Sequence, residues 1–220
     1  MLNKLISDIK DCYRLTKIRR SKYIVLYAGD IPIHNCHYSA NIVGLSLHQN
    51  ENRHIKHNIL NKHPFKDNSI DIYQSEDVFE HIEYNKLEDI VRDIYRILKP
   101  NGLFRLSTPD YRCDVLYTRS IKDGNGNIIF DEGGGGIYSE HYKKVINGGH
   151  VWFPKYEDVK YLLEKIPFQK IDFLHYYGEN NKPHCSKIDY SKGYIQRTPD
   201  HDNRVKNPYR PMSIVVDCYK

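Results

Sequence analysis

The pattern of apolar and polar positions divides the chain into short apolar runs and amphipathic stretches. Apolar runs of strand length, bounded by turn residues, predict buried strands at residues 22–29, 40–47, 53–59, 70–73, 103–109, 169–177 and 212–220. Apolar residues that recur every three or four positions predict helices at residues 3–20, 84–98 and 155–166. The helix at 84–98 has the clearest pattern, and Lys99-Pro100-Asn101-Gly102 ends it, because proline cannot continue the hydrogen-bond ladder.

The order of these elements, with helices or loops between successive strands, predicts an α/β fold with a mostly parallel sheet. Two connections, 110–152 and 178–211, are longer than the ~12–15 residues usual for loops in a compact domain. Both follow the carboxyl ends of strands, where open α/β sheets bind ligands. We therefore expect one domain over residues 1–220, with an N-terminal helix at 1–21 and two substrate-side insertions.

Composition narrows the class of protein. The chain has 220 residues, of which 40% are hydrophobic, and this suits a single domain with a real core. No run reaches the ~18 apolar residues of a membrane helix, and the charged N-terminus does not resemble a signal peptide. The net charge of +5 favours anionic ligands, but no basic tract supports nucleic-acid binding. Scattered cysteines predict reduced thiols in a cytoplasmic protein: Cys12, Cys36, Cys113, Cys185 and Cys218.

Two histidine pairs and one glycine run resemble ligand-binding motifs, but the residues around them do not fit a metal or a phosphate site. The pairs His34/His37 and His54/His57 have no second pair at metal-ligand spacing, so no metal site is predicted. The glycine run at 133–136 is followed by no Gly-Lys-Ser/Thr, so it does not resemble a phosphate loop. We expect it to be a lid hinge or a disordered tip.

Three motifs in the segment 64–111 indicate a family. They are Pro64–Asp71 (PFKDNSID), Val78–His81 (VFEH) and Leu98–Gly102 (LKPNG). In this order and at this spacing they resemble the middle of class I S-adenosylmethionine-dependent methyltransferases. The tail, from GGHVWF at 148–153 to the final strand, is similar to the small predicted methyltransferases associated with surface-glycan synthesis.

The resemblance implies a Rossmann-like sheet of seven strands, mostly parallel, with an antiparallel strand near one edge and helices on both faces. It also implies S-adenosylmethionine bound over the first, second and fourth strands. The residues expected to bind it are Ala28, Gly29, Asp30, Ser46, Leu47, His57, Asn58, Ile59, Ser75, Glu76 and His81. Gly29 is the only glycine of the first loop, and Ser46 replaces the usual ribose-binding acid, so we expect modest cofactor affinity.

Methyl transfer to a hydroxyl needs alignment and a proton acceptor, and a histidine suits the second role. His150 is the first candidate, unless it is only a packed loop residue. His81 is either a base or pocket wall, or a helix-start residue bonded to Glu80 or to backbone. Asp110 is either a base or hydroxyl-binding residue, or a turn residue that bonds local amides.

The acceptor site is expected to draw on both insertions. The candidate substrate-binding residues are Tyr111, Trp152, His201, Asp202 and Arg204. The Trp152 ring suits a sugar face, and Arg204 suits a phosphate or carboxylate. For the last three residues, a solvated loop is the alternative.

The sequence therefore predicts an S-adenosylmethionine-dependent O-methyltransferase that acts on a hydroxyl of a sugar or glycan and releases S-adenosylhomocysteine. A methyltransferase for another small molecule or a nucleic acid is one alternative. An inactive methyltransferase-like binding module is the other, supported by Gly29 and Ser46. The expected partner is a small-molecule or glycan acceptor, with a homodimer left open.

Overall fold

The computed structural model describes residues 16, 20–32, 42–50 and 53–220. The helix predicted at 3–20 therefore lies almost entirely outside the described residues, as do His34, Cys36 and His37. Within the described ranges, no helix is long and apolar enough to span a membrane.

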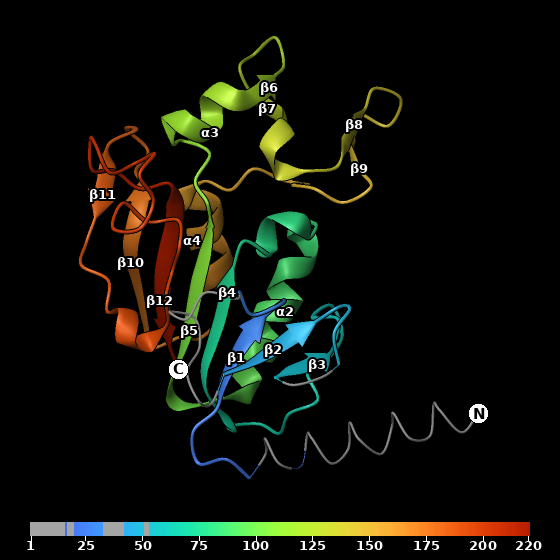
Figure 1. Cartoon of the computed structure of the whole chain (residues 1–220), viewed down its shortest axis with the longest axis vertical. Helices are drawn as coiled ribbons and strands as arrows, with labels where there is room; N and C mark the ends of the chain where they lie inside the picture. The colour runs from blue at the N-terminus through green and yellow to red at the C-terminus, as the bar shows by residue number, and fades with distance from the viewer. Residues whose placement is uncertain (1–15, 17–19, 33–41, 51–52) are drawn as a thin grey trace.

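A mixed sheet of eight strands forms the centre of the molecule (Figure 1). Its order is β11-β10-β12-β5-β4-β1-β2-β3, and neighbours from β3 to β5 are parallel. The strands are β1 (Val25–Ala28), β2 (Ile42–Ser46), β3 (His54–Lys56), β4 (Ile70–Glu76), β5 (Leu98–Pro109), β10 (Lys170–Tyr177), β11 (Pro183–Cys185) and β12 (Ser213–Tyr219). β12 is antiparallel to both β5 and β10. The predicted fold class is confirmed, and β11 at the edge makes eight strands instead of seven.

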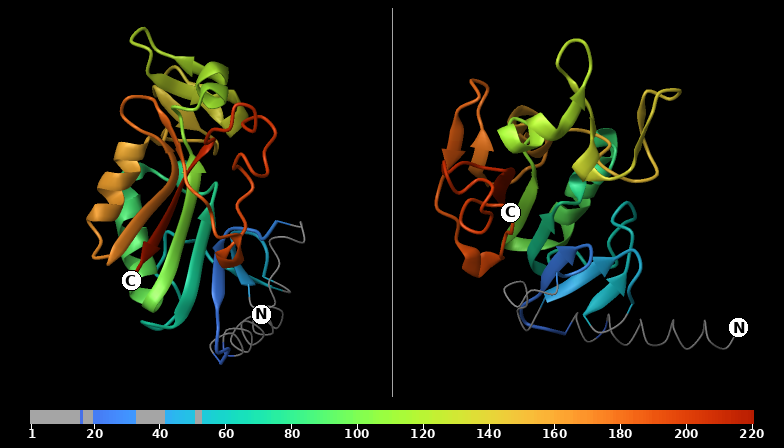
Figure 2. Two further views of the ribbon diagram at one scale, coloured as in Figure 1. Left: turned by 90° about the vertical axis from the view of Figure 1, so that its left-hand side faces the viewer. Right: turned by 45° about the horizontal axis from the view of Figure 1, so that its top comes forward.

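One face of the sheet is covered by the helices α2 (Tyr84–Ile97) and α4 (Tyr156–Glu164), as the left view of Figure 2 shows. Both helices were predicted from their apolar spacing. Their inward side chains, such as Ile94 and Leu163, pack with Phe104 of β5 in the main hydrophobic core. Each such buried side chain contributes about 1.5–3 kcal/mol. The core thus holds the strands in place and fixes their carboxyl ends relative to one another.

The opposite face, over β4, β5 and β12, is covered by the second insertion. There the fully buried Arg105 of β5 donates to both carboxylate oxygens of Asp217 on β12, at 2.8 and 2.7 Å. Arg105 also donates to the carbonyls of Asp189 and Gly193 at 2.9 and 2.7 Å. Gly193 lies so close to Gln74 of β4 that a side chain there would collide with it. The middle of this insertion therefore packs against the sheet and covers it. The sequence had predicted only a place beside the substrate for this insertion.

The first insertion lies above the carboxyl ends of the strands (Figure 1). It contains α3 (Asp114–Arg119), the hairpin β6 (Ser120–Lys122)–β7 (Ile128–Asp131), the 3-10 turn η3 (Glu132–Gly134) and the hairpin β8 (Ile137–Ser139)–β9 (Lys144–Ile146).

The glycine run at 133–136 was predicted to be a hinge or a disordered tip, and the structure corrects this. A side chain at Gly134 would collide with the ring of His150, whose Cγ lies 2.7 Å from the position of a Cβ. One at Gly149 would collide with the Gly135 carbonyl, and Gly135, Gly136 and Gly149 all have positive φ. The run allows two chain segments to approach closely, and this close approach positions His150.

Candidate active site

The carboxyl ends of β1, β2 and β4 form the edge at which the cofactor was expected. Gly29 follows β1 with φ +97°, and its amide donates to the Leu45 carbonyl at 2.9 Å. The nearest atom to a Cβ built there is Val78 Cγ2, at 3.9 Å, so the space beside this turn is open. Asp30, the next residue, is exposed. A single glycine thus gives the first loop its left-handed turn.

His54 of β3 supports this loop, a role that its sequence pattern did not indicate. Its side chain lies against Gly44 of β2, where a Cβ would collide with the imidazole. Its Nε2 accepts from the Ile31 amide at 3.0 Å. His54 therefore links β2 to the chain that follows Gly29.

Ser46, at the end of β2, hydrogen-bonds to the backbone that follows it. The buried Ser46 hydroxyl accepts from the amides of His48 and Gln49, at 3.0 and 2.8 Å. Ser46 therefore fixes a turn, and the exposed Leu47 beyond it faces solvent.

The positions after β3 divide between core and surface. Ile59 packs in the main hydrophobic core. Asn58 is exposed, and its side chain accepts from the Leu60 amide at 3.0 Å. Burial, together with the nearby His63, lowers the pKa of His57 to about 4. Of these three residues, only Asn58 offers an exposed polar side chain.

Buried acids mark the end of β4. Glu76 Oε1 accepts from the Gln196 amide at 2.7 Å, and burial raises the pKa of Glu76 to about 7. Asp77 has φ 53° and pairs with Arg197 at 2.9 Å, while burial raises its pKa as well. Glu76 Oε2, Asp77 Oδ1 and the hydroxyl of Ser75 are buried without a hydrogen-bond partner. Acceptor atoms of this kind suit a ligand with positive charge, and S-adenosylmethionine carries a sulfonium and an ammonium group.

His150 lies in a buried chain of hydrogen bonds above this edge. The Tyr111 hydroxyl donates to Asp131 Oδ2 at 2.6 Å and also contacts Nδ1 of His150. Because the hydroxyl has one hydrogen, His150 Nδ1 carries the proton in this contact, and its Nε2 keeps a lone pair. Arg119 pairs with Asp131 at 2.6 Å and completes the chain. Burial, with a contribution from His81, lowers the pKa of His150 to about 4.

His81 is brought to His150 although the two are far apart in sequence. Their rings meet edge to face with centroids 4.7 Å apart. His81 is exposed, and its Nδ1 lies 2.9 Å from the Gly149 carbonyl, so Nδ1 donates and Nε2 keeps its lone pair. The two predicted catalytic histidines therefore share one site.

Glu80 completes the cluster. It is fully buried, and its Oε2 accepts from the Thr108 hydroxyl at 3.1 Å. Its Oε1 has no hydrogen-bond partner and lies 3.7 Å from His150 Nε2. Burial raises the pKa of Glu80 to about 8, and the nearby Asp77 adds to this shift.

Asp110 lies apart from this cluster and is fully buried. Its two oxygens accept from the amides of Arg112 and Tyr177, at 3.0 and 2.7 Å. These contacts correspond to the turn-residue alternative, and they tie the end of β5 to the end of β10.

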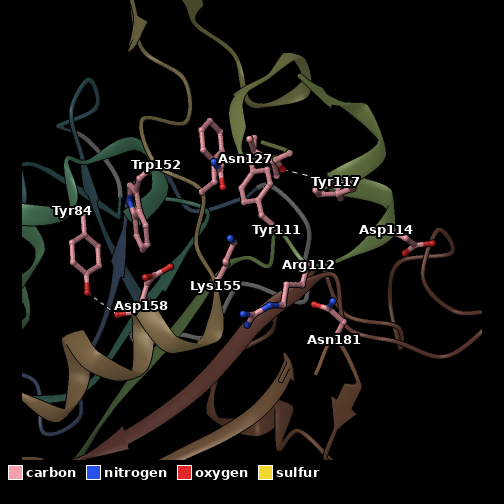
Figure 3. Close-up of a pocket in the computed structure, with 13 residues that line it drawn as sticks. Tyr84, Tyr111, Arg112, Asp114, Tyr117, Asn127, Trp152, Lys155, Asp158 and Asn181 are labelled. Carbon is pink, nitrogen blue, oxygen red and sulfur yellow. Dashed lines mark hydrogen bonds between the residues drawn. The ribbon is translucent and has the colours of Figure 1, made fainter. Parts of the chain in front are cut away.

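A cavity of about 740 Å³ opens next to Tyr111, under the first insertion. Figure 3 shows Lys155 between the rings of Trp152 and Tyr111. The Trp152 indole N–H donates to the Phe79 carbonyl at 2.8 Å, which joins this wall to the loop after β4. The lining is aromatic with polar and charged groups between the rings: Tyr84, Tyr111, Arg112, Asp114, Tyr117, Gly126, Asn127, Ile128, Trp152, Phe153, Lys155, Asp158 and Asn181. Two predicted substrate residues, Tyr111 and Trp152, are among them.

The other predicted substrate residues do not line this cavity. His201 donates from Nδ1 to the Ile195 carbonyl at 2.9 Å. Asp202 and Arg204 pair with each other at 2.6 Å. From the same insertion it is Arg197 that reaches the end of β4, and sequence alone did not single it out.

Comparisons with known proteins agree with this architecture. Residues 21–106 match the family model described as "Methyltransferase domain". A SAM-dependent methyltransferase from Archaeoglobus fulgidus is 14% identical with a TM-score of 0.50, covering 97% of this chain and 94% of that one. A SAM-dependent methyltransferase from Mesorhizobium loti is 15% identical with a TM-score of 0.50, covering 90% of each chain. No curated protein matches the sequence significantly.

At these identities the solved structures establish a shared fold, and the family match covers the strands that form the cofactor edge. Together they support a methyltransferase of the class I, Rossmann-like type.

Proposed function

We propose that this protein methylates a hydroxyl of a sugar or glycan. The observation that carries the proposal is the aromatic and polar cavity that adjoins His81 and His150 through Tyr111. Aromatic faces bind the apolar faces of sugar rings, while polar groups such as Asp158 and Asn181 can bond ring hydroxyls. The volume of about 740 Å³ is typical of small-molecule sites.

The cofactor is expected along the ends of β1, β2 and β4. Gly29 offers open space, and the unpartnered acceptor atoms of Ser75, Glu76 and Asp77 lie near it at the end of β4. Bound there, S-adenosylmethionine supplies a methyl group on a positively charged sulfur. We retain the predicted contacts of Ala28, Asp30 and the positions after β2 and β3 as part of this proposal.

The chain's own residues then position the acceptor and accept its proton. His81 is the more accessible base, because it is exposed and its Nε2 keeps a lone pair. His150 is held beside it by Tyr111 and Asp131, and the two rings direct a hydroxyl toward the cofactor edge. We do not retain Asp110 as a base, because both of its oxygens bind backbone amides.

Two further parts of the proposal concern the biological role and the location of the enzyme. The tail motif that is similar to glycan-associated methyltransferases favours a role in surface-glycan synthesis. The described cysteines, Cys113, Cys185 and Cys218, are free thiols, and we retain a cytoplasmic location as part of the proposal.

The test is a methyl-transfer screen with S-adenosylmethionine whose methyl group carries deuterium. Monosaccharides, nucleotide sugars and oligosaccharides are offered as acceptors, and mass spectrometry detects products that gain one labelled methyl group. We expect transfer to a sugar hydroxyl, with a large loss of rate in His81→Asn. Transfer only to amines or nucleic acids, or no transfer by a protein that binds the cofactor, would contradict the proposed acceptor.

A further inference from the structure

Three potential ligand atoms converge beside the acceptor cavity. Glu80, His81 and His150 each present one such atom, and these atoms all lie within 4.8 Å of one another. Glu80 Oε1 and His150 Nε2 are 3.7 Å apart, too far for a hydrogen bond. Two ligands that bind one ion at ~2.0–2.2 Å are separated by a distance of this order. Glu80 Oε1 is fully buried, has no hydrogen-bond partner and faces this space.

The hydrogen bonds behind the cluster fix the histidines in the form that binds a metal. His81 donates from Nδ1 to the Gly149 carbonyl, and His150 donates from Nδ1 to the Tyr111 hydroxyl, which is itself bonded to Asp131. Both Nε2 atoms therefore keep lone pairs. Outer contacts of this kind orient the imidazoles of metal sites. The other oxygen of Glu80 is held by Thr108, so the carboxylate is oriented in the same way.

The two arginines near this cluster each pair with another acid. Arg197 is bound to Asp77 at 2.9 Å, and Arg119 is bound to Asp131 at 2.6 Å. Each arginine thus has an acid of its own.

We propose that Glu80, His81 and His150 form a binding site for one divalent first-row transition-metal ion. Two imidazoles and one carboxylate suit Zn²⁺ and its neighbours in the series better than Mg²⁺ or Ca²⁺, which prefer oxygen ligands alone. Three protein ligands leave a coordination position free, and His81 is the exposed member of the three.

The role of the ion, though not its binding, rests on the proposed function. A nitrogen that binds a metal cannot also accept a proton, so with the ion bound His81 is a ligand and not the base. The metal site therefore keeps the acceptor of the proposed function and replaces its histidine base. The ion lowers the pKa of a coordinated acceptor hydroxyl, whose proton is released to water.

The experiment is calorimetric titration of metal-depleted protein with Zn²⁺ alone, repeated with Mg²⁺. We expect one saturable Zn²⁺ site that His81→Asn and Glu80→Gln weaken at least tenfold, and little heat with Mg²⁺. His81 is exposed, so its variant is expected to stay folded, which circular dichroism checks. The control is His184→Asn on β11, an exposed histidine away from the cluster, which leaves Zn²⁺ affinity unchanged.

The proposal is overturned if the wild-type protein binds no Zn²⁺, or if His81→Asn and Glu80→Gln bind it as tightly as the wild type. Methyl transfer is measured separately. Zn²⁺ binding lost in these variants, without transfer to any sugar, supports the metal site and contradicts the proposed function. Full transfer by a wild type that binds no Zn²⁺ supports the function and overturns the metal site.

Discussion

Tyr111 places its hydroxyl against Nδ1 of His150, and this contact determines which nitrogen of the imidazole faces the candidate active site. The hydroxyl donates to Asp131, so the proton between Tyr111 and His150 belongs to the histidine. Nε2 of His150 therefore carries a lone pair, and it faces Glu80. Tyr111 also lines the acceptor cavity, so one residue joins the substrate wall to the chemical cluster.

Replacing Tyr111 by Phe tests this relationship. The variant keeps the ring but removes the acceptor for His150 Nδ1 and the donor to Asp131. We expect a fall in kcat of roughly 10- to 100-fold, the range typical when a hydrogen bond that orients a functional imidazole is lost, with KM for the acceptor little changed. Tyr117→Phe is the matched control, because Tyr117 lines the same cavity and its hydroxyl donates to the Gly126 carbonyl and not to the histidine cluster. Equal kcat in both variants would contradict the role of Tyr111.

Trp152 is expected to act on the acceptor and not on the cofactor. Trp152→Leu removes the aromatic face. We expect KM for a sugar acceptor to rise about three- to tenfold, which corresponds to about 0.5–1.5 kcal/mol. Trp152→Phe retains a ring and should have a smaller effect. Tyr161→Leu, an exposed aromatic of α4 outside the cavity, is the control. A change in cofactor affinity with unaltered acceptor KM would show that Trp152 acts elsewhere.

The Arg105–Asp217 pair is expected to dominate the stability of the second insertion. Arg105→Met leaves Asp217 buried without a partner and deprives the carbonyls of Asp189 and Gly193 of a donor. We expect the free energy of unfolding in urea to fall by about 3–5 kcal/mol. The double variant with Asp217→Leu should recover much of this loss, because no charge stays buried alone.

The surface ion pair Arg92–Glu88 provides the comparison for that measurement. Arg92→Met should cost less than about 1 kcal/mol, because the pair is exposed to water. If Arg92→Met and Arg105→Met lowered the free energy of unfolding equally, burial of the Arg105–Asp217 pair would make no difference to stability.

Glu76 is expected to make stability depend on pH. Burial raises its pKa from 4.5 to about 7, so the folded state holds a proton that the unfolded chain releases. The stabilisation from this proton is complete below about pH 4.5 and is lost as the pH rises to about 7. Relative to Glu76→Gln, the wild type should lose about 3 kcal/mol of unfolding free energy across this range.

Urea unfolding of both proteins at several pH values checks this. Glu76→Gln retains the carbonyl oxygen that accepts from Gln196, so the two proteins differ mainly in the titrating group. A constant difference in unfolding free energy between pH 4.5 and 7 would contradict the raised pKa.

The sequence predicted the backbone well because periodic apolar positions report burial. The helix predicted at 84–98 ends at Ile97, and Asn101 has the positive φ expected of the Asn-Gly turn after it. The short strand β11 was missed, because Pro183–Cys185 has no apolar alternation and pairs only at the sheet edge. The fold of the glycine run at 133–136 was also missed, because its conformation depends on contacts with a distant segment.

The site was predictable only in part, for a similar reason. His81 and His150 were selected by motif, but nothing local in the sequence shows that their rings meet. The expectation of no metal was based on histidines that are close in sequence, and it stays a prediction. The site proposed above combines Glu80 and His81 with the distant His150, which only the fold brings to them. Asp131 and Arg197 act through pairs formed across insertions, which no periodicity reveals.

The cofactor edge provides the most direct test of the account, because the proposed methyl transfer depends on S-adenosylmethionine bound beside Gly29 and Glu76. Titration calorimetry of the full chain with S-adenosylmethionine should give saturable binding at one site, weakened in Gly29→Val, where a branched side chain is forced to φ +97°. The absence of any binding heat at millimolar cofactor, from a protein shown to be folded, would contradict the assignment as a methyltransferase.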